Sequence, residues 1–297
     1  MEQKIKLLDP KVLARLTNLY LVARTAVEGF ITGLHKGLYK GFSVEFYEHR
    51  EYVPGDDLKY LDWKVFGRTD RLYLKTFREE TNLRSYILLD ISNSMNFSSL
   101  SITKLRYGIF LAASLSYLMV NQQDAVGLIT FDKEVRNFLK CSSTSTHLHS
   151  LLNILEGIKA GGETSIGEVI EKIVPSIKKR SLIILISDLL DNPENVIKGL
   201  SHFRHKHHEV IVFQILDPAE VYFPYEGSCE FFDLETNEKI TVDVPYVRET
   251  YRRIFREFLE GYRKSFSERN IDYQVALTDK PFDNFLYNYL NVRSKFK

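Results

Sequence analysis

An aspartate and two serines, Asp90, Ser92 and Ser94, stand in the pattern Asp-x-Ser-x-Ser directly after a short apolar run. The run, Tyr86–Leu89, has the composition of a β-strand, so the motif is predicted to lie on the loop at the carboxyl end of that strand. Carboxylate and hydroxyl oxygens are ligands that hard cations prefer, and Mg²⁺ holds them in a compact octahedron. The three side chains therefore predict part of a Mg²⁺ site, at which Mn²⁺ or Ca²⁺ could replace the ion.

Two further oxygen ligands are predicted from segments far away in the sequence. Thr164 follows a Gly-Gly-Glu loop just before a predicted helix, and Asp188 follows the apolar run Leu182–Ser187. In open α/β sheets, ligands bind outside the carboxyl ends of the strands, where the strand order reverses. We therefore expect both segments to meet the Asp90 loop at one edge of the sheet and to complete the metal site.

The same residue types also have a purely structural use, because Asp, Ser and Thr after a strand commonly cap helices and form turns. An Asp-x-Ser-x-Ser pattern alone would arise by chance in about one chain in ten of this length. Its position after a core strand, together with Thr164 and Asp188, favours metal binding over capping.

The ligand types distinguish adhesion from hydrolysis. Neutral hydroxyls leave most of the metal's positive charge uncompensated, so the site should accept a carboxylate from another protein. A metal-dependent hydrolase would need more carboxylates and a placed base, for which Glu163 is the only near candidate. The sequence carries no nucleotide-binding glycine loop, serine nucleophile elbow or His-Glu-x-x-His helix. We expect a binding protein rather than an enzyme, with a hydrolase, or a scaffold whose metal site is vestigial, as the alternatives.

Residues from 83 onward are predicted to form the α/β domain that positions these ligands. Short β-branched and leucine runs alternate with amphipathic stretches, which indicates βα units and a mainly parallel sheet with helices on both faces. Strands are predicted at Tyr86–Leu89, Ala125–Phe131, Arg136–Leu139, Leu182–Ser187, Val210–Leu216 and Asp272–Ala276. Helices are predicted at Lys104–Val120, Leu148–Ile158, Ser165–Ile177, Asn195–Phe203, Val247–Phe266 and Pro281–Leu290. A β-hairpin insertion is expected near residues 218–245.

Composition narrows the function classes. The 297 residues carry 40 basic and 39 acidic side chains, a formal net charge of +1, so no global field attracts nucleic acid. No apolar stretch is long enough for a membrane span or for the core of an export signal. The two cysteines, Cys141 and Cys229, stand in no paired spacing and suit a reducing compartment. These features predict a cytoplasmic protein without a direct membrane span.

The first 82 residues are expected to form a separate N-terminal region. A helix is predicted up to about residue 30, and Pro54-Gly55 suits a turn after which Asp56 or Asp57 can cap a short helix. A second metal or catalytic site is the alternative use of these aspartates. Four histidines between residues 202 and 208 could hold Zn²⁺, but a solvated helix end explains them without a third ligand.

A resemblance to a known family rests on two regions. Residues 41–80 read GFSVEFYEHREYVPGDDLKYLDWKVFGRTDRLYLKTFREE, and this block resembles the signature of the DUF58 family. The Asp90 motif, Thr164 and Asp188 look like the metal ion-dependent adhesion site of von Willebrand factor A domains, over residues 83–297. DUF58 proteins join such a block to an A-like domain. The resemblance therefore covers almost the whole chain and implies a von Willebrand factor A-like, Rossmann-like fold after the DUF58 signature region.

The resemblance also implies ligand roles. The three residues of the Asp90 motif would coordinate the ion directly, Thr164 would do so in one conformational state, and Asp188 would act directly or through water. Many A domains have glycine after this second aspartate, whereas this chain has Leu189. That departure leaves both roles open for Asp188.

A partner class follows from the same resemblance. DUF58 proteins are typically encoded beside MoxR-type AAA+ ATPases in bacteria. The resemblance therefore implies an Mg²⁺-dependent adaptor that works with such an ATPase, or with its client, in complex assembly or chaperoning. An acidic residue of that partner would complete the metal sphere.

Overall fold

A computed structural model of the chain describes residues 18–33, 49–51, 63–69, 71–75, 83–234 and 238–295. The chain divides into two compact units. One comprises residues 1–35 together with 83–297, and the other comprises residues 36–82.

Three short elements lie in the described residues of the smaller unit. Strand β1 (His49–Glu51) pairs antiparallel with β2 (Tyr73–Lys75), and helix α4 (Trp63–Thr69) lies between them in the chain. Asp56 and Asp57, which we expected to cap a helix, lie outside the described residues.

The larger unit is built on a six-stranded sheet in the order β10-β7-β6-β3-β4-β5. Its strands are β3 (Arg84–Asp90), β4 (Ala125–Phe131), β5 (Val135–Ser142), β6 (Leu182–Ser187), β7 (Glu209–Leu216) and β10 (Asp272–Leu277). All neighbouring strands are parallel except β4 and β5, which form an antiparallel pair at one edge. The strand order reverses between β3 and β6, so the crevice for a ligand is expected at their carboxyl ends.

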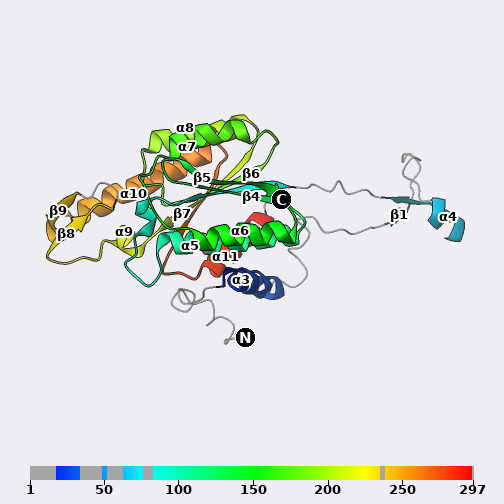
Figure 1. The fold of residues 1–297 in the computed structure, drawn as a ribbon, viewed down its shortest axis with the longest axis horizontal. Coiled ribbons are helices and arrows are strands. Elements are labelled where there is room, and N and C mark those ends of the chain that lie inside the picture. The colour runs from blue at the N-terminus through cyan, green and yellow to red at the C-terminus, as the bar shows by residue number, and fades with distance from the viewer. Residues whose placement is uncertain are drawn as a thin grey trace. The chain divides into compact units, whose positions relative to one another are not determined.

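Helices cover both faces of this sheet (Figure 1). One face carries α3 (Leu19–Gly33), α5 (Lys104–Asn121), α6 (Ser145–Gly157) and α11 (Phe282–Lys295), and the other carries α7 (Ile166–Ile173), α8 (Pro193–His205) and α10 (Val244–Glu268). Side chains alternate along β3, so that Ile87 and Leu89 join the first core while Tyr86 and Leu88 join the second. The predicted mainly parallel α/β fold is confirmed.

Smaller elements complete the larger unit. Among the residues that the structure describes, these include the 3₁₀ helices η4 (Asn93–Asn96) and η5 (Val174–Ser176), the short helix α9 (Pro218–Tyr222), and the hairpin of β8 (Ser228–Phe232) with β9 (Lys239–Asp243). The hairpin was predicted, whereas α9 was not. No helix in the described part of the chain is long and apolar enough to cross a membrane.

Helix α3 departs from the expected domain division. Its buried side chains, Leu19 and Val22 among them, belong to the same apolar core as α5. The backbone N–H of Leu19 also donates to the Glu156 carboxylate at the end of α6, at 2.9 Å. An amphipathic helix needs an apolar surface to cover, and the outer side of α5 supplies it. The expected division at residue 82 therefore does not hold for this helix.

Candidate metal centre

Asp90 lies at the point where the strand order reverses. It ends β3, and its side chain is fully buried. Oδ1 accepts a hydrogen bond from the backbone N–H of Ser92 at 3.0 Å, and Oδ2 accepts one from the hydroxyl of Ser187 at 2.7 Å. Since Ser187 ends the neighbouring strand β6, the carboxylate is held from both strands between which the strand order reverses.

The two serines of the motif lie side by side. Their Oγ atoms are 3.0 Å apart, with Ser92 fully buried and Ser94 half-buried. Two neighbouring ligands in an octahedron with metal–oxygen distances of about 2.1 Å lie about 3.0 Å apart. One carboxylate and two adjacent hydroxyls are therefore a donor set that fits Mg²⁺.

Helix capping does not explain the Ser92 hydroxyl. Ser92 is the N-cap residue of η4, yet its side chain makes no capping hydrogen bond. The following helix α5 is capped by Thr103, whose hydroxyl accepts from the N–H of Arg106 at 3.1 Å. The capping alternative is therefore wrong for the Ser92 side chain.

The loop that carries Thr164 is hydrogen-bonded to the Asp90 loop. Gly161 N–H donates to the carbonyl of Ile91 at 2.9 Å, and Asn93 N–H donates to the carbonyl of Gly162 at 3.0 Å. Gly162 has a φ of +80°, and a Cβ there would lie 2.7 Å from a carboxylate oxygen of Asp132. The predicted meeting of the two loops at one edge is confirmed, and the role of Thr164 as a ligand stays a prediction.

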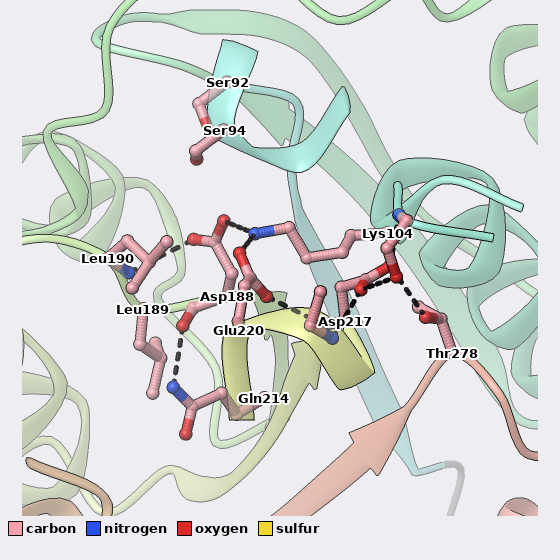
Figure 2. Close-up of polar contacts among 12 residues, drawn as sticks. Ser92, Ser94, Lys104, Asp188, Leu189, Leu190, Gln214, Asp217, Glu220 and Thr278 are labelled. Atoms are coloured by element: carbon pink, nitrogen blue, oxygen red, sulfur yellow. Dashed lines mark hydrogen bonds and ion pairs between the residues drawn. The ribbon is translucent and has the colours of Figure 1, made fainter. Parts of the chain in front are cut away.

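Asp188 reaches the same edge but is already paired. Its buried carboxylate accepts from the Lys104 ammonium at 2.7 Å through Oδ2 and from the N–H of Leu190 at 3.1 Å through Oδ1 (Figure 2). The same ammonium lies 2.5 Å from Oε1 of Glu220. Both carboxylate oxygens of Asp188 thus have protein partners, and its role at a metal ion, direct or through water, stays a prediction.

Lys104 and Glu220 were not found from the sequence. Lys104 begins α5, and a lysine in the first turn of a helix is ordinarily read as a surface residue. Its two carboxylate partners are 84 and 116 residues away, so no local pattern reveals them. Glu220 had a readable signal, because Asp217-Pro-Ala-Glu220 is a capping-box pattern with proline at the first helical position.

The polar network continues across the sheet edge. Oε2 of Glu220 accepts from the N–H of Asp217 at 2.8 Å, and the buried Asp217 carboxylate accepts from the N–H of Ser99 at 2.9 Å. Asp217 also accepts from the hydroxyl of Thr278, at 3.4 Å (Figure 2). These contacts connect the ends of β7 and β10 with the loop that follows the Asp-x-Ser-x-Ser motif.

Leu189 occupies the position where many A domains have glycine, and it adopts the left-handed conformation with φ of +58°. Its side chain is fully buried in the second core. Its carbonyl accepts from the Tyr262 hydroxyl at 3.2 Å, and its N–H donates to the Ser187 hydroxyl at 2.9 Å. Burial of the side chain offsets a backbone conformation that glycine would adopt without strain.

At position 189 we therefore expect a glycine variant to be more stable than an alanine variant, which is the reverse of the usual order. Leu189→Ala should lower the free energy of unfolding by about 2–5 kcal/mol, since it empties part of a packed core. Leu189→Gly should be less damaging than Leu189→Ala by about 1 kcal/mol, because only glycine avoids the left-handed strain. Urea unfolding of both variants measures the difference. A glycine variant that is less stable than the alanine variant would contradict the claim that the backbone of Leu189 is strained.

Burial and charge perturb the ionisable groups of the site. Burial, and then the neighbouring charge of Asp188, raise the pKa of Asp90 to about 7. Burial alone would lower the pKa of Lys104, but the charges of Asp188 and Glu220 raise it above the ordinary lysine value. The ammonium therefore stays charged, while the Asp90 carboxylate in the metal-free protein still lacks a compensating cation.

The raised pKa of Asp90 predicts how metal stabilisation varies with pH. In the unfolded chain this carboxyl ionises near its ordinary value of about 3.9. As the pH rises from about 4 to about 7, the metal-free protein should therefore lose stability, because over this range only the unfolded state has released the proton. Above pH 7 the carboxylate is ionised in both states and open to Mg²⁺. Each pH unit below 7 should therefore remove about 1.4 kcal/mol of stabilisation by Mg²⁺.

Thermal unfolding with and without saturating Mg²⁺ at pH 6 and pH 8 checks this. The rise in Tm should be larger at pH 8, by a few degrees. Asp90→Asn, which has no proton to lose, should show no Mg²⁺ effect at either pH. An equal rise in Tm at both pH values in the unsubstituted protein would count against Asp90 as a ligand.

The other candidate residues take ordinary structural positions. Glu163, the candidate base of a hydrolase, is exposed, and its carboxylate lies 3.8 Å from the ammonium of Lys133. His208 is buried and accepts from the N–H of Ser181 through Nδ1 at 3.1 Å. Within the described ranges, no group of three or more His, Cys, Asp or Glu side chains is placed to hold a metal ion.

The chain is similar to proteins of two mycobacteria and to solved structures of other proteins. An uncharacterized protein of Mycobacterium tuberculosis is 26% identical over 250 residues, which cover 82% of this chain and 78% of the relative, and a protein of Mycobacterium bovis matches equally. The protein BatB of Bacteroides thetaiotaomicron superposes with a TM-score of 0.49 at 18% identity, over 72% of this chain and all of BatB. The SpRpn10 VWA domain superposes with a TM-score of 0.41 at 11% identity, over 69% of this chain and 93% of that domain.

A family match covers most of the chain. Residues 48–259 match the family described as "Protein of unknown function DUF58". The match spans the end of the signature block, the Asp-x-Ser-x-Ser loop, the Thr164 loop and the strands β3 and β6. The chain belongs to the DUF58 family and has the mainly parallel α/β fold, with helices on both faces of the sheet, that its sequence predicts.

Proposed function

We propose that the protein is an Mg²⁺-dependent adaptor that binds another protein through a shared metal ion. Asp90, Ser92 and Ser94 would hold the ion, with Thr164 and Asp188 beside it. A carboxylate from the partner would complete the sphere. The observation that carries the proposal is the pair of serine hydroxyls, whose Oγ atoms lie 3.0 Å apart next to a buried carboxylate where the strand order reverses. The Ser92 hydroxyl makes no helix-capping hydrogen bond.

The composition of the donor set supports adhesion rather than hydrolysis. One carboxylate and neutral hydroxyls leave the ion with net positive charge, which attracts an acidic oxygen from outside. The candidate base Glu163 is paired with Lys133 on the surface. A hydrolase would instead need a base positioned against the metal-bound water.

The proposed partner is a MoxR-type AAA+ ATPase or its client. This part of the proposal rests on membership of the DUF58 family, whose members are typically encoded beside such ATPases. The adaptor would act in the cytoplasm, which suits two cysteines that are both free thiols.

Co-purification from the native cell tests the proposal. The chain and its Asp90→Ala variant are each captured with Mg²⁺ and with a chelator, giving four samples. We expect a partner only with the unsubstituted chain in Mg²⁺, and a MoxR-type ATPase among the captured proteins. Equal retention in all four samples would refute metal-bridged binding and favour a scaffold with a vestigial site.

A further inference from the structure

A buried ammonium lies beside the proposed metal site. The Lys104 side chain is fully buried, and its Nζ lies 2.7 Å from Asp188 and 2.5 Å from Glu220. Nζ also lies 5.8 Å from the centre of the Phe97 ring. A lysine that is removed from water in this way is rare unless its charge is matched by buried partners.

Both carboxylate partners have their other oxygens engaged. The second oxygen of Asp188 accepts from the N–H of Leu190, and the second oxygen of Glu220 accepts from the N–H of Asp217 (Figure 2). Each carboxylate is thus held in place by backbone on one side and turned to Lys104 on the other. The ammonium is therefore fixed in position at the sheet edge and is not a mobile surface charge.

The fixed cation changes the charge that a metal ion would meet. Asp90 ends β3 and Asp188 follows the neighbouring strand β6, so the two carboxylates lie at the same sheet edge, and without a nearby cation the pair would bind a divalent cation tightly. Lys104 compensates Asp188 and leaves Asp90 as the carboxylate without a cation. A bound ion then keeps more of its positive charge for an outside ligand.

We propose that Lys104 is a positioning residue of the metal site, which limits its affinity for Mg²⁺ and keeps the bound ion receptive to a partner's carboxylate. This inference rests on the proposed function. Lys104 would hold Asp188 away from direct coordination and offset its charge. The site would thereby bind Mg²⁺ less tightly, and the bound ion would attract an acidic partner more strongly.

Calorimetric titration of Mg²⁺ into the purified full chain at pH 8 tests the inference. Two substitutions that remove charges of opposite sign should affect the Mg²⁺ affinity differently. Lys104→Met removes a positive charge and should tighten Mg²⁺ binding by about tenfold or more. Glu220→Gln removes a negative charge from the same cluster and should leave the affinity unchanged or weaken it. Lys104→Arg, which keeps the charge, should stay within about threefold of the unsubstituted chain.

A merely structural role predicts a different pattern. Damage to the packing of the sheet edge would weaken Mg²⁺ binding in Lys104→Met and in Glu220→Gln alike, and that result would overturn the inference. If Lys104→Met alone does not fold, the double variant with Glu220→Gln removes one charge of each sign. It should bind Mg²⁺ about tenfold more tightly than Glu220→Gln alone. Equal affinity of these two variants would also overturn the inference.

The two proposals fail in different ways. An unsubstituted chain that binds no Mg²⁺ contradicts the proposed function itself. An unsubstituted chain that binds Mg²⁺, combined with a Lys104→Met variant that binds it no more tightly, contradicts only the role of Lys104.

Discussion

Replacing Asp90 by asparagine should weaken Mg²⁺ binding by at least about 100-fold, because loss of an outer-shell group alone costs about 10–100-fold at metal sites. The substitution keeps the size of the side chain and the acceptor for the Ser92 N–H, but it removes the charge that holds the ion. Titration calorimetry of the unsubstituted chain and the variant measures the change.

The same variant should gain stability when metal is absent. At pH 8 the unsubstituted protein must hold an ionised Asp90 in a buried site near Asp188, whereas asparagine carries no charge. The gain should be smaller at pH 5, since Asp90 is then protonated in the folded state. A variant that loses Mg²⁺ binding through misfolding would instead be less stable at both pH values.

A matched control is available at the opposite end of the sheet. Asp124 lies just before β4, is buried, and accepts from the N–H of Leu83 at 3.2 Å. Burial raises the pKa of Asp124 to about 6, so Asp124 is, like Asp90, a buried carboxyl group with a raised pKa, but it lies away from the serine pair. Asp124→Asn should leave Mg²⁺ affinity unchanged. A loss of affinity equal to that of Asp90→Asn would contradict a local metal site.

Removing the charge of Lys104 should destabilise the metal-free protein by about 3–5 kcal/mol, because it leaves buried carboxylates without their cation. Lys104→Met keeps most of the apolar side chain, so the loss reports the charge rather than the volume. Adding Glu220→Gln to it should recover part of the stability, since one of the two uncompensated carboxylates is then neutral. Urea unfolding of the single and double variants measures the coupling.

An exposed ion pair provides the comparison for this prediction. Arg253 and Glu257 on α10 are 3.1 Å apart, and both side chains are more than 60% exposed. Pairs of this kind contribute little because water screens them. Arg253→Met should therefore change stability far less than Lys104→Met. Similar losses of stability in both variants would contradict the claim that burial makes the charge of Lys104 important for stability.

The core strands could be predicted closely from the sequence. The predicted bounds of β4 and β6 agree with the structure, because Ala125–Phe131 and Leu182–Ser187 are apolar runs buried on both faces. The helices were predicted less closely at their ends. For example, the predicted helix Ser165–Ile177 is observed as α7 followed by the 3₁₀ turn η5 around Pro175.

The candidate site was predictable where its residues follow strands. Asp90 and Asp188 could be brought together in advance, because the carboxyl ends of parallel strands share one edge. Lys104 could not, because its role depends on two carboxylates that only the tertiary fold brings to it. The placement of α3 on α5 was equally hidden, since an amphipathic pattern shows that a helix needs a partner surface but not which one.

A crystal of the chain soaked in Mn²⁺ tests the central proposal most directly, because Mn²⁺ takes the same oxygen ligands as Mg²⁺ and scatters anomalously. We expect one anomalous peak about 2.1 Å from the Oγ atoms of both Ser92 and Ser94, beside Asp90, and no such peak in crystals of Asp90→Asn. A peak that survives in Asp90→Asn, or a crystal without a peak between the two serines, would contradict the proposed metal site.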